Sequence, residues 1–255
     1  MRLQKNSFTK IIINVFLFLF TSSIGVVLFL IILARDLPKL DELQKFSPDT
    51  VTKIYSSDGN LLRELFIQKR DVVSLGKMPQ NLINAVISME DRTFYQHSGI
   101  DIRGILRAIV VDIMTMSRKQ GASTLTQQLA RNMYDTIGFD KTITRKLKEL
   151  LTAIQIEKTF TKSEIIELYL NSVYFGHGQY GVQAASHYYF GKNVEELTLS
   201  DCGILIGLLP APAYYSPIKH PNSAKKRRKI VLNAMESIGY ISNKAKPKAL
   251  SQPLT

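Results

Sequence analysis

A long hydrophobic segment without a charged side chain opens the chain, from Ile11 to Ala34. Its 24 residues would form a helix about 36 Å long, enough to cross a hydrocarbon core of about 30 Å. The apolar stretch of a cleaved signal peptide is shorter, at about 7–15 residues. The pattern therefore predicts an uncleaved transmembrane anchor over residues 11–34, between a tail of residues 1–10 and a polar tether of residues 35–50.

Charges on the two sides of this segment predict its orientation. Arg2, Lys5 and Lys10 precede it without an acidic residue, whereas Arg35 and Lys39 after it alternate with acidic residues. Cytoplasmic flanks of membrane helices carry an excess of Lys and Arg. The N-terminus is therefore expected in the cytoplasm, and the rest of the chain on the outer side of the membrane.

Beyond the tether, the pattern predicts one mainly helical domain over residues 51–250. Two β-prone runs, 51–55 and 61–66, flank the turn pair Asp58-Gly59 and favour a hairpin. Apolar residues then recur at three- and four-residue spacing, which is typical of helices. Helices are expected from Pro79 to about Asp91, over 100–116, 144–159, 165–171 and 199–205, from Val182 onward, and as a last basic helix over 224–238.

Two of these helices have a face whose environment matters. Residues 100–116 are strongly apolar but contain Arg103 and Arg107, so that a core helix and a helix at the membrane interface both fit. The helix over 144–159 has an apolar stripe with Glu149 roughly opposite it. The stripe consists of Leu147, Leu150, Leu151 and Ile154. By itself, Glu149 fits a solvated pair with Arg145, worth about 0.3–0.5 kcal/mol.

The amino-acid composition predicts that the protein has an anionic partner. Lys and Arg number 33 against 21 Asp and Glu, a formal charge of +12. Nucleic acid, an anionic membrane surface and a phosphorylated substrate would all suit that charge. The predicted topology excludes nucleic acid. The chain has one cysteine, Cys202, in an apolar helix, so neither a disulfide framework nor a Cys/His zinc site is expected.

Five segments resemble, in the same order, the signatures of glycosyltransferase family 51, the peptidoglycan glycosyltransferases. They are residues 90–101 (EDRTFYQHSGID), 121–132 (GASTLTQQLARN), 145–149 (RKLKE), 162–171 (KSEIIELYLN) with Tyr174-Phe175-Gly176, and 227–235 (RRKIVLNAM). Arg131 departs from the lysine usual in the family. It keeps the charge, but a planar guanidinium can bind phosphate through two donors. The family comprises monofunctional transglycosylases and class A penicillin-binding proteins.

The resemblance implies a lysozyme-like, two-lobed helical domain that polymerises lipid II, a disaccharide-pentapeptide on undecaprenyl diphosphate. The acceptor 4-hydroxyl would displace the diphosphate with inversion, giving a β-1,4-linked glycan strand. The implied partners are lipid II, the nascent glycan, membrane lipids, transpeptidases and other wall-synthesis proteins. The membrane is then the bacterial cytoplasmic (inner) membrane, with the domain on its outer, periplasmic face, and residues 100–120 are expected to touch it.

The resemblance also implies the roles of individual residues. Glu90 is expected to be the general base, with a pKa raised by partial desolvation. Glu149 would orient cations, hold a divalent metal ion such as Mg²⁺ or Mn²⁺, or assist departure of the diphosphate; no organic cofactor is expected. The expected substrate-binding residues are Ser123, Thr124, Gln127, Gln128, Arg131, Arg145 and Lys146. His97 is expected to be structural. Arg227 and Arg228 are expected to be structural too, on the solvated face of the last basic helix.

Two other classes of function also remain open. A lysozyme-like enzyme that cleaves glycan would use carboxylates too, and a non-enzymatic membrane scaffold would recruit wall-synthesis proteins. The basic residues around Glu149 and the anchor favour synthesis over cleavage. The presence of both carboxylates, Glu90 and Glu149, disfavours an inactive scaffold.

Overall fold

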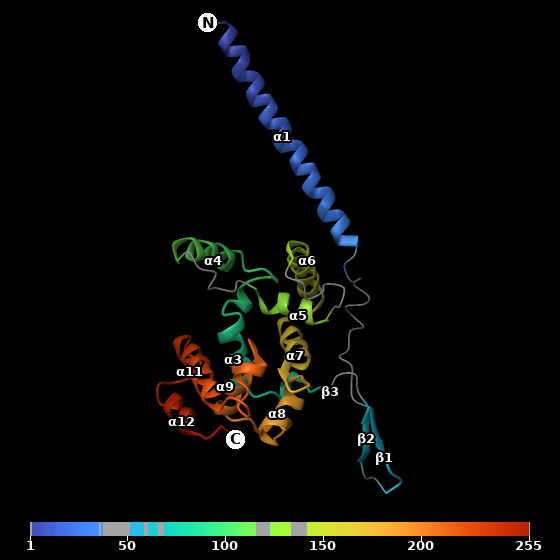
Figure 1. Ribbon diagram of the computed structural model, residues 1–255, viewed down its shortest axis with the longest axis vertical. Coiled ribbons are helices and arrows are strands. Elements are labelled where there is room, and N and C mark those ends of the chain that lie inside the picture. The colour runs from blue at the N-terminus through green and yellow to red at the C-terminus, as the bar shows by residue number, and fades with distance from the viewer. Residues whose placement is uncertain are drawn as a thin grey trace.

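The computed structural model describes residues 2–35, 37, 52–58, 61–65, 69–115, 123–133 and 142–254 (Figure 1). The helices are α1 (Arg2–Arg35), α3 (Gln80–Glu90), α4 (Ile102–Thr115), α5 (Leu125–Met133), α6 (Ile143–Thr159), α7 (Lys162–Ser172), α8 (Val182–Phe190), α9 (Leu199–Leu208), α10 (Pro212–Tyr215), α11 (Pro221–Ser237) and α12 (Ala245–Ser251). Short 3-10 helices are η1 (Leu75–Lys77), η2 (Phe94–Gln96) and η4 (Val194–Glu196). The predicted mainly helical fold class is confirmed.

Most of the N-terminal helix α1 extends away from the domain, and α1 contacts the domain at α6 (Figure 1). It extends past both ends of the predicted anchor, and its segment Ile12–Phe29 has a mean hydropathy of 2.4 with none of it buried against protein. By length and composition, this helix could cross a membrane. Most of the predicted tether, residues 38–50, lies outside the described residues.

Two small sheets accompany the helices. The predicted hairpin is confirmed, since β1 (Thr52–Tyr55) pairs antiparallel with β2 (Leu61–Leu65). A second sheet has the order β3 (Lys69–Arg70), β5 (Gln179–Tyr180), β4 (Tyr174–Gly176), with β3 and β5 parallel. Its strands have two or three residues, too few to show a period of two, and the sequence did not predict them.

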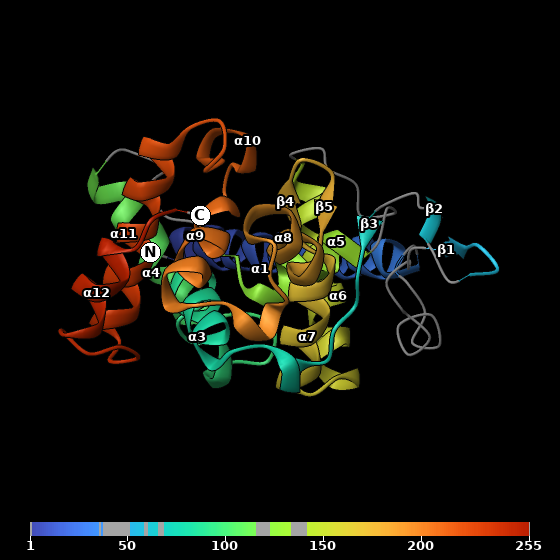
Figure 2. The same ribbon diagram turned by 90° about the horizontal axis from the view of Figure 1, so that it is seen from below.

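The helices of the domain pack as two groups. In one group, α3, α9 and α11 pack against one another, and in the other α5 packs against α6 and α7. The two groups lie side by side in both views (Figures 1 and 2). A continuous hydrophobic core joins them, with Leu82, Leu129, Tyr169 and Leu205 fully buried. The predicted capping box of Thr161 and Glu164 is present at the start of α7.

The basic helix α11 differs from its prediction in two respects. It is not the last helix, because α12 follows it. Its residue Arg228 is also not on a solvated face, since it is 3% exposed. Its guanidinium donates to Ser200 Oγ at 2.7 Å and to the carbonyl oxygens of Leu250 and Gln252, each at 2.9 Å. Arg228 therefore ties the C-terminal segment to the core, a task for which the fixed fork of guanidinium donors is suited.

Helix α6 is rotated about its axis relative to its prediction. Its buried face consists of Glu149, Thr152, Ala153 and Ile156. The predicted apolar stripe (Leu147, Leu150, Leu151, Ile154) is only half-buried and lies on the opposite side. The hydrophobic pattern alone chose the wrong face, because a charged residue can be buried where cations neutralise it.

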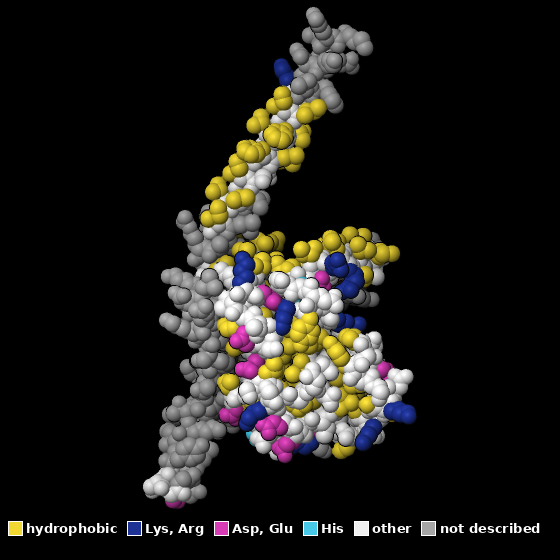
Figure 3. Space-filling view, turned by 180° about the vertical axis from the view of Figure 1, so that it is seen from behind, with side chains coloured by type: hydrophobic (Ala, Val, Ile, Leu, Met, Phe, Trp, Pro, Cys, Tyr) yellow, Lys and Arg dark blue, Asp and Glu magenta, His cyan; other side chains and the backbone are white. Residues whose placement is uncertain are grey.

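Helix α4 is a surface helix, and the core alternative for residues 100–116 is therefore wrong. Only Gly104 and Ala108 are buried. Its outer face is apolar and exposed, and comprises Ile102, Leu106, Ile109, Val110, Ile113 and Met114. Figure 3 shows these hydrophobic side chains along the end of the domain that α1 approaches. Residues 116–122, the rest of the predicted membrane-contact region, lie outside the described residues.

Candidate active site

Glu90 lies at a pocket between the two helix groups. It is the last residue of α3, as the sequence predicts, because the buried residues of α3 anchor that helix in the core. The pocket has a volume of ≈ 320 Å³. Its lining comes from α3, α5, the segment from α7 to β4, and the segment from the end of α9 to the start of α10: Glu90, Gln128, Arg131, Asn132, Tyr169, Val173, Tyr174, Leu209, Pro210 and Pro212.

The carboxylate of Glu90 is held by a neutral donor and surrounded by cations. Gln128 Nε2 donates to Glu90 Oε2 at 2.9 Å. Burial raises the pKa of Glu90 above its ordinary value. The hydrogen bond from Gln128 and the charges of Arg227 and Arg131 act against that rise. A carboxylate with a raised pKa that remains hydrogen-bonded in its ionised form suits general-base chemistry.

The second predicted carboxylate, Glu149, lies under a cluster of cations. Its side chain is 2% exposed. Arg145 Nη1 donates to Glu149 Oε1, and Lys146 Nζ lies 3.1 Å from Oε2. Arg131 Nη1 lies 3.9 Å from Oε1 and also lines the Glu90 pocket, so that it connects the two carboxylates. The solvated i,i+4 pair that the sequence also allowed is therefore wrong for Glu149.

The cluster around Glu149 has a surplus of positive charge. Its three cations carry +3 and its carboxylate −1, which leaves +2. Lys146 Nζ also donates to Ser123 Oγ at 2.7 Å and to Gln127 Oε1 at 2.8 Å. The buried Nε of Arg145 has no hydrogen-bond partner within the described residues. The cluster can therefore accept an anion with several acceptor oxygens.

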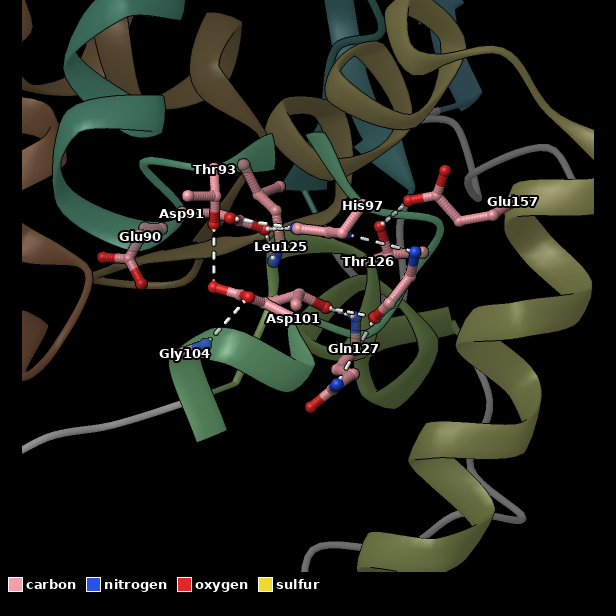
Figure 4. A network of polar contacts seen from close by, with 12 residues as sticks. Glu90, Asp91, Thr93, His97, Asp101, Gly104, Leu125, Thr126, Gln127 and Glu157 are labelled. Atoms are coloured by element: carbon pink, nitrogen blue, oxygen red, sulfur yellow. Dashed lines mark hydrogen bonds and ion pairs between the residues drawn. The ribbon is translucent and has the colours of Figure 1, made fainter. Parts of the chain in front are cut away.

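A polar network behind the pocket fixes the ends of α3 and α5 (Figure 4). Asp91 Oδ2 accepts from the Leu125 N–H and from His97 Nε2, each at 3.0 Å. His97 Nδ1 accepts from the Gly99 N–H at 3.2 Å, so the ring proton is on Nε2. These contacts agree with the structural role predicted for His97. Gly99 has φ +88, and a Cβ there would lie 2.8 Å from Ala153 O, which requires glycine.

Two of the predicted substrate-binding residues are bonded to this network. Thr124 Oγ1 donates to Gly99 O at 2.7 Å, and Gln127 Nε2 donates to the same oxygen at 3.3 Å. Both side chains are about 1% exposed. Their polar atoms hold α5 in place, and substrate contact by either one stays a prediction. At the pocket or the cation cluster lie Ser123, Gln128, Arg131, Arg145 and Lys146. Gln127 also reaches the cluster, since its Oε1 accepts from Lys146.

The described residues do not fit a protein-held divalent metal ion at Glu149. Both carboxylate oxygens are bound to cations, and the local charge is positive. No group of three or more His, Cys, Asp or Glu side chains suited to a metal occurs in the part of the chain that the structure describes. Oxygen-ligated Mg²⁺ and Mn²⁺ require anionic or neutral donors with free lone pairs. We therefore derive no catalytic step through a metal.

Arg227 is a residue of this site that the sequence analysis assigned to a structural role. Its charge lowers the pKa of Glu90, and its guanidinium lies 5.4 Å from the centre of the Tyr215 ring. Gly207 makes room for it, since a Cβ there would lie 3.0 Å from Arg227 Cγ. Glu90 and Arg227 are 137 positions apart in sequence, and no spacing pattern could have predicted that they lie near each other.

Comparisons with known proteins show the family to which the chain belongs. The family model described as Transglycosylase matches residues 58–236. Penicillin-binding protein 1A of Aquifex aeolicus (strain VF5) is 42% identical over 246 residues, 96% of this chain and 34% of that protein. Penicillin-binding protein 1F of Bacillus subtilis (strain 168) is 40% identical over 235 residues, 92% of this chain and 32% of that protein. This chain thus spans about a third of the length of these curated relatives.

The chain is also similar to a solved structure. The crystal structure of penicillin-binding protein 1A from Haemophilus influenzae is 26% identical and has a TM-score of 0.47, covering 82% of this chain and 21% of that one. The family match includes both carboxylates, the cation cluster and the Asp91–His97 network. On the family match and the identity to these relatives, the chain belongs to the Transglycosylase family.

Proposed function

We propose that this protein polymerises lipid II into β-1,4-linked peptidoglycan strands and releases undecaprenyl diphosphate. The observation that carries the proposal is the pocket at the half-buried Glu90, which Arg131 connects to a cation cluster with a surplus charge of +2. A diphosphate leaving group is an anion of several oxygens and fits such a cluster. Its donor sugar would then lie in the pocket beside Glu90.

The reaction is a single in-line displacement. The acceptor 4-hydroxyl oxygen attacks the anomeric carbon of the donor, and the bond from that carbon to the diphosphate oxygen breaks. Glu90 takes the proton of the hydroxyl, while the electron pair of the broken bond leaves on the diphosphate. Arg131, Arg145 and Lys146 stabilise the charge that develops there. Glu149 holds these cations in place, so that little reorganisation is needed when the charge appears.

The location that we propose is the outer face of the bacterial cytoplasmic membrane, with the N-terminus inside. Helix α1 would be the single anchor, and the apolar outer face of α4 would lie in the membrane interface. Arg103 and Arg107 on α4 would then reach lipid phosphates. The lipid tail of the substrate would remain in the bilayer while its sugars enter the pocket.

Single tryptophans can test the membrane contact of α4, because the chain contains none. Ile113 is 72% exposed on α4, whereas Ile230 is 47% exposed on α11. In vesicles, the tryptophan of the Ile113→Trp variant is expected to emit at shorter wavelength than tryptophan in water. Brominated lipids should quench its fluorescence, because the side chain lies among acyl chains. The tryptophan of the Ile230→Trp variant is expected to emit like tryptophan in water and to escape quenching. Equal quenching at both positions would contradict the proposed contact.

Turnover of labelled lipid II tests the proposed function directly. The full chain in detergent is incubated with lipid II, in parallel with Mg²⁺, with Mn²⁺ and with a chelator, and the products are separated by size. We expect a ladder of glycan that lysozyme digests. Cleavage of preformed glycan instead would favour the lysozyme-like alternative, and binding of lipid II without turnover would favour the scaffold. Turnover only with metal would show that an ion takes part in the reaction.

A further inference from the structure

A buried chain of hydrogen bonds ends on the carboxylate of Glu90. Tyr169 in α7 is fully buried, and its hydroxyl lies 3.2 Å from Gln128 Oε1 in α5. The amide nitrogen of Gln128 donates in turn to Glu90 Oε2 in α3 at 2.9 Å. Each of three helices thus supplies one member of the chain. Its geometry is therefore fixed by the packing of α3, α5 and α7 and not by one flexible side chain.

The direction of each bond follows from the chemistry of the groups. Burial, and then the charge of Glu90, raises the pKa of Tyr169 well above its ordinary value. The phenol therefore keeps its proton and donates it to Gln128 Oε1. With its carbonyl turned toward Tyr169, the amide presents its NH₂ group to Glu90. The flipped amide would set Gln128 Oε1 against an ionised carboxylate oxygen, which is repulsive.

We propose that Tyr169 is a positioning residue that acts through Gln128 to hold the carboxylate of Glu90 in one orientation. Oε2 is held by the amide, while Oε1 has no hydrogen bond to any described residue and can receive the proton of the acceptor hydroxyl. The inference rests on the proposed function, in which Glu90 is the base. It also gives Gln128 a task other than the substrate contact predicted from the sequence.

The hydrogen bond from Gln128 favours the ionised form of Glu90 and opposes the effect of burial. Without Tyr169 the amide is free to rotate, and the carboxylate loses an oriented donor. Glu90 should then bind a proton more readily, so that its pKa rises. For loss of a hydrogen bond to a charged group, an upward shift of about one pH unit is expected.

The experiment compares the wild type with Tyr169→Phe and with a matched control, Tyr189→Phe. Tyr189 is also a buried tyrosine, but its hydroxyl donates to Phe175 O at 2.8 Å, away from Glu90. Two quantities are measured on the full chain in detergent. One is the acidic limb of kcat/KM for lipid II against pH. The other is the titration of the Glu90 carboxyl by ¹³C NMR of glutamate-labelled protein, with the resonance assigned through Glu90→Gln.

In Tyr169→Phe, both the acidic limb and the titration of Glu90 are expected to move up by about one pH unit, with KM nearly unchanged. Neither moves in Tyr189→Phe. A rate that falls equally at every pH, without a shift of the titration, would overturn the proposal and leave Tyr169 a packing residue. The NMR titration needs no turnover. A failure of the proposed function, seen as an inactive wild type, is therefore distinguishable from a failure of this inference.

A second variant covers the case in which Tyr169→Phe does not fold. Gln128→Met keeps the length of the side chain and removes the amide. An upward shift of the Glu90 titration at least as large is expected, because the donor is lost outright. A raised KM with an unmoved titration would instead assign Gln128 to the substrate and overturn the proposal.

Discussion

Lipid II polymerisation is expected to fall by about 10²–10⁴-fold in Glu90→Gln, the usual contribution of a general base. The amide keeps the size of the side chain but cannot accept the proton of the acceptor hydroxyl at Oε1. In the wild type, the rate should fall as the pH is lowered through the raised pKa of Glu90, since the protonated acid is no base. Initial rates of glycan formation across pH measure both effects. Retained turnover in Glu90→Gln would remove Glu90 from this role.

Stability provides the control for the same variant. The pKa of Glu90 is raised in the folded protein, so its contribution to stability is full below the unfolded pKa and is lost as pH rises through the folded pKa. At neutral pH, the buried carboxylate therefore destabilises the fold relative to a neutral amide. Glu90→Gln is expected to be at least as stable as the wild type in denaturant unfolding at pH 7, so that its lost activity does not reflect unfolding.

The second large effect is expected at Glu149. Removing one partner of a buried ion pair costs about 3–5 kcal/mol. Here the cations are partly exposed, with side chains 15–39% accessible, and can be hydrated. We therefore expect Glu149→Gln to lower the free energy of unfolding by about 3 kcal/mol, at the lower end of that range. Turnover should fall as well, because the cations are no longer held together.

Added pyrophosphate can distinguish loss of the charge that holds the cations at Glu149 from a general loss of stability. Added pyrophosphate should restore more stability to Glu149→Gln than to the wild type, because it replaces the missing negative charge. The matched control is Glu157→Gln on the same helix. Glu157 is also buried but bonds to Lys162 and Thr126, at 2.8 and 2.6 Å. That variant should lose stability without gaining more from pyrophosphate than the wild type. Equal responses of both variants would contradict a special role for Glu149.

The sequence predicted the elements of this fold better than the faces that they bury. Apolar spacing placed α3 so that it ends at Glu90, and the Thr161–Glu164 capping box marked the start of α7. Both signals are local, within one or two turns of a helix. The face of α6 was wrong because burial of Glu149 depends on cations, one of which, Arg131, comes from α5. Periodicity cannot report a neighbour on another element.

The site shows the same division. Motif resemblance named Glu90, Glu149 and the cations, and the structure brings these into one pocket and its adjoining cluster. The resemblance did not distinguish Thr124 and Gln127, whose polar atoms bind Gly99, from residues that are open to a ligand. Nor did it find the charge of Arg227 near Glu90, because α11 reaches α3 only through the tertiary fold.

The two faces of α6 bear on where the chemistry takes place. One face carries Glu149 toward the cations, and the opposite face carries half-buried leucines. Helix α6 lies at the end of the domain where α4 also lies (Figure 1). A helix with its side chains is about 10–12 Å thick. On the proposed function, the diphosphate would thus be bound at about the depth of the lipid headgroups. The protein would then encounter its substrate by diffusion within the plane of the membrane. The number of lipid-linked sugars per area of the leaflet would determine how often the active site is occupied.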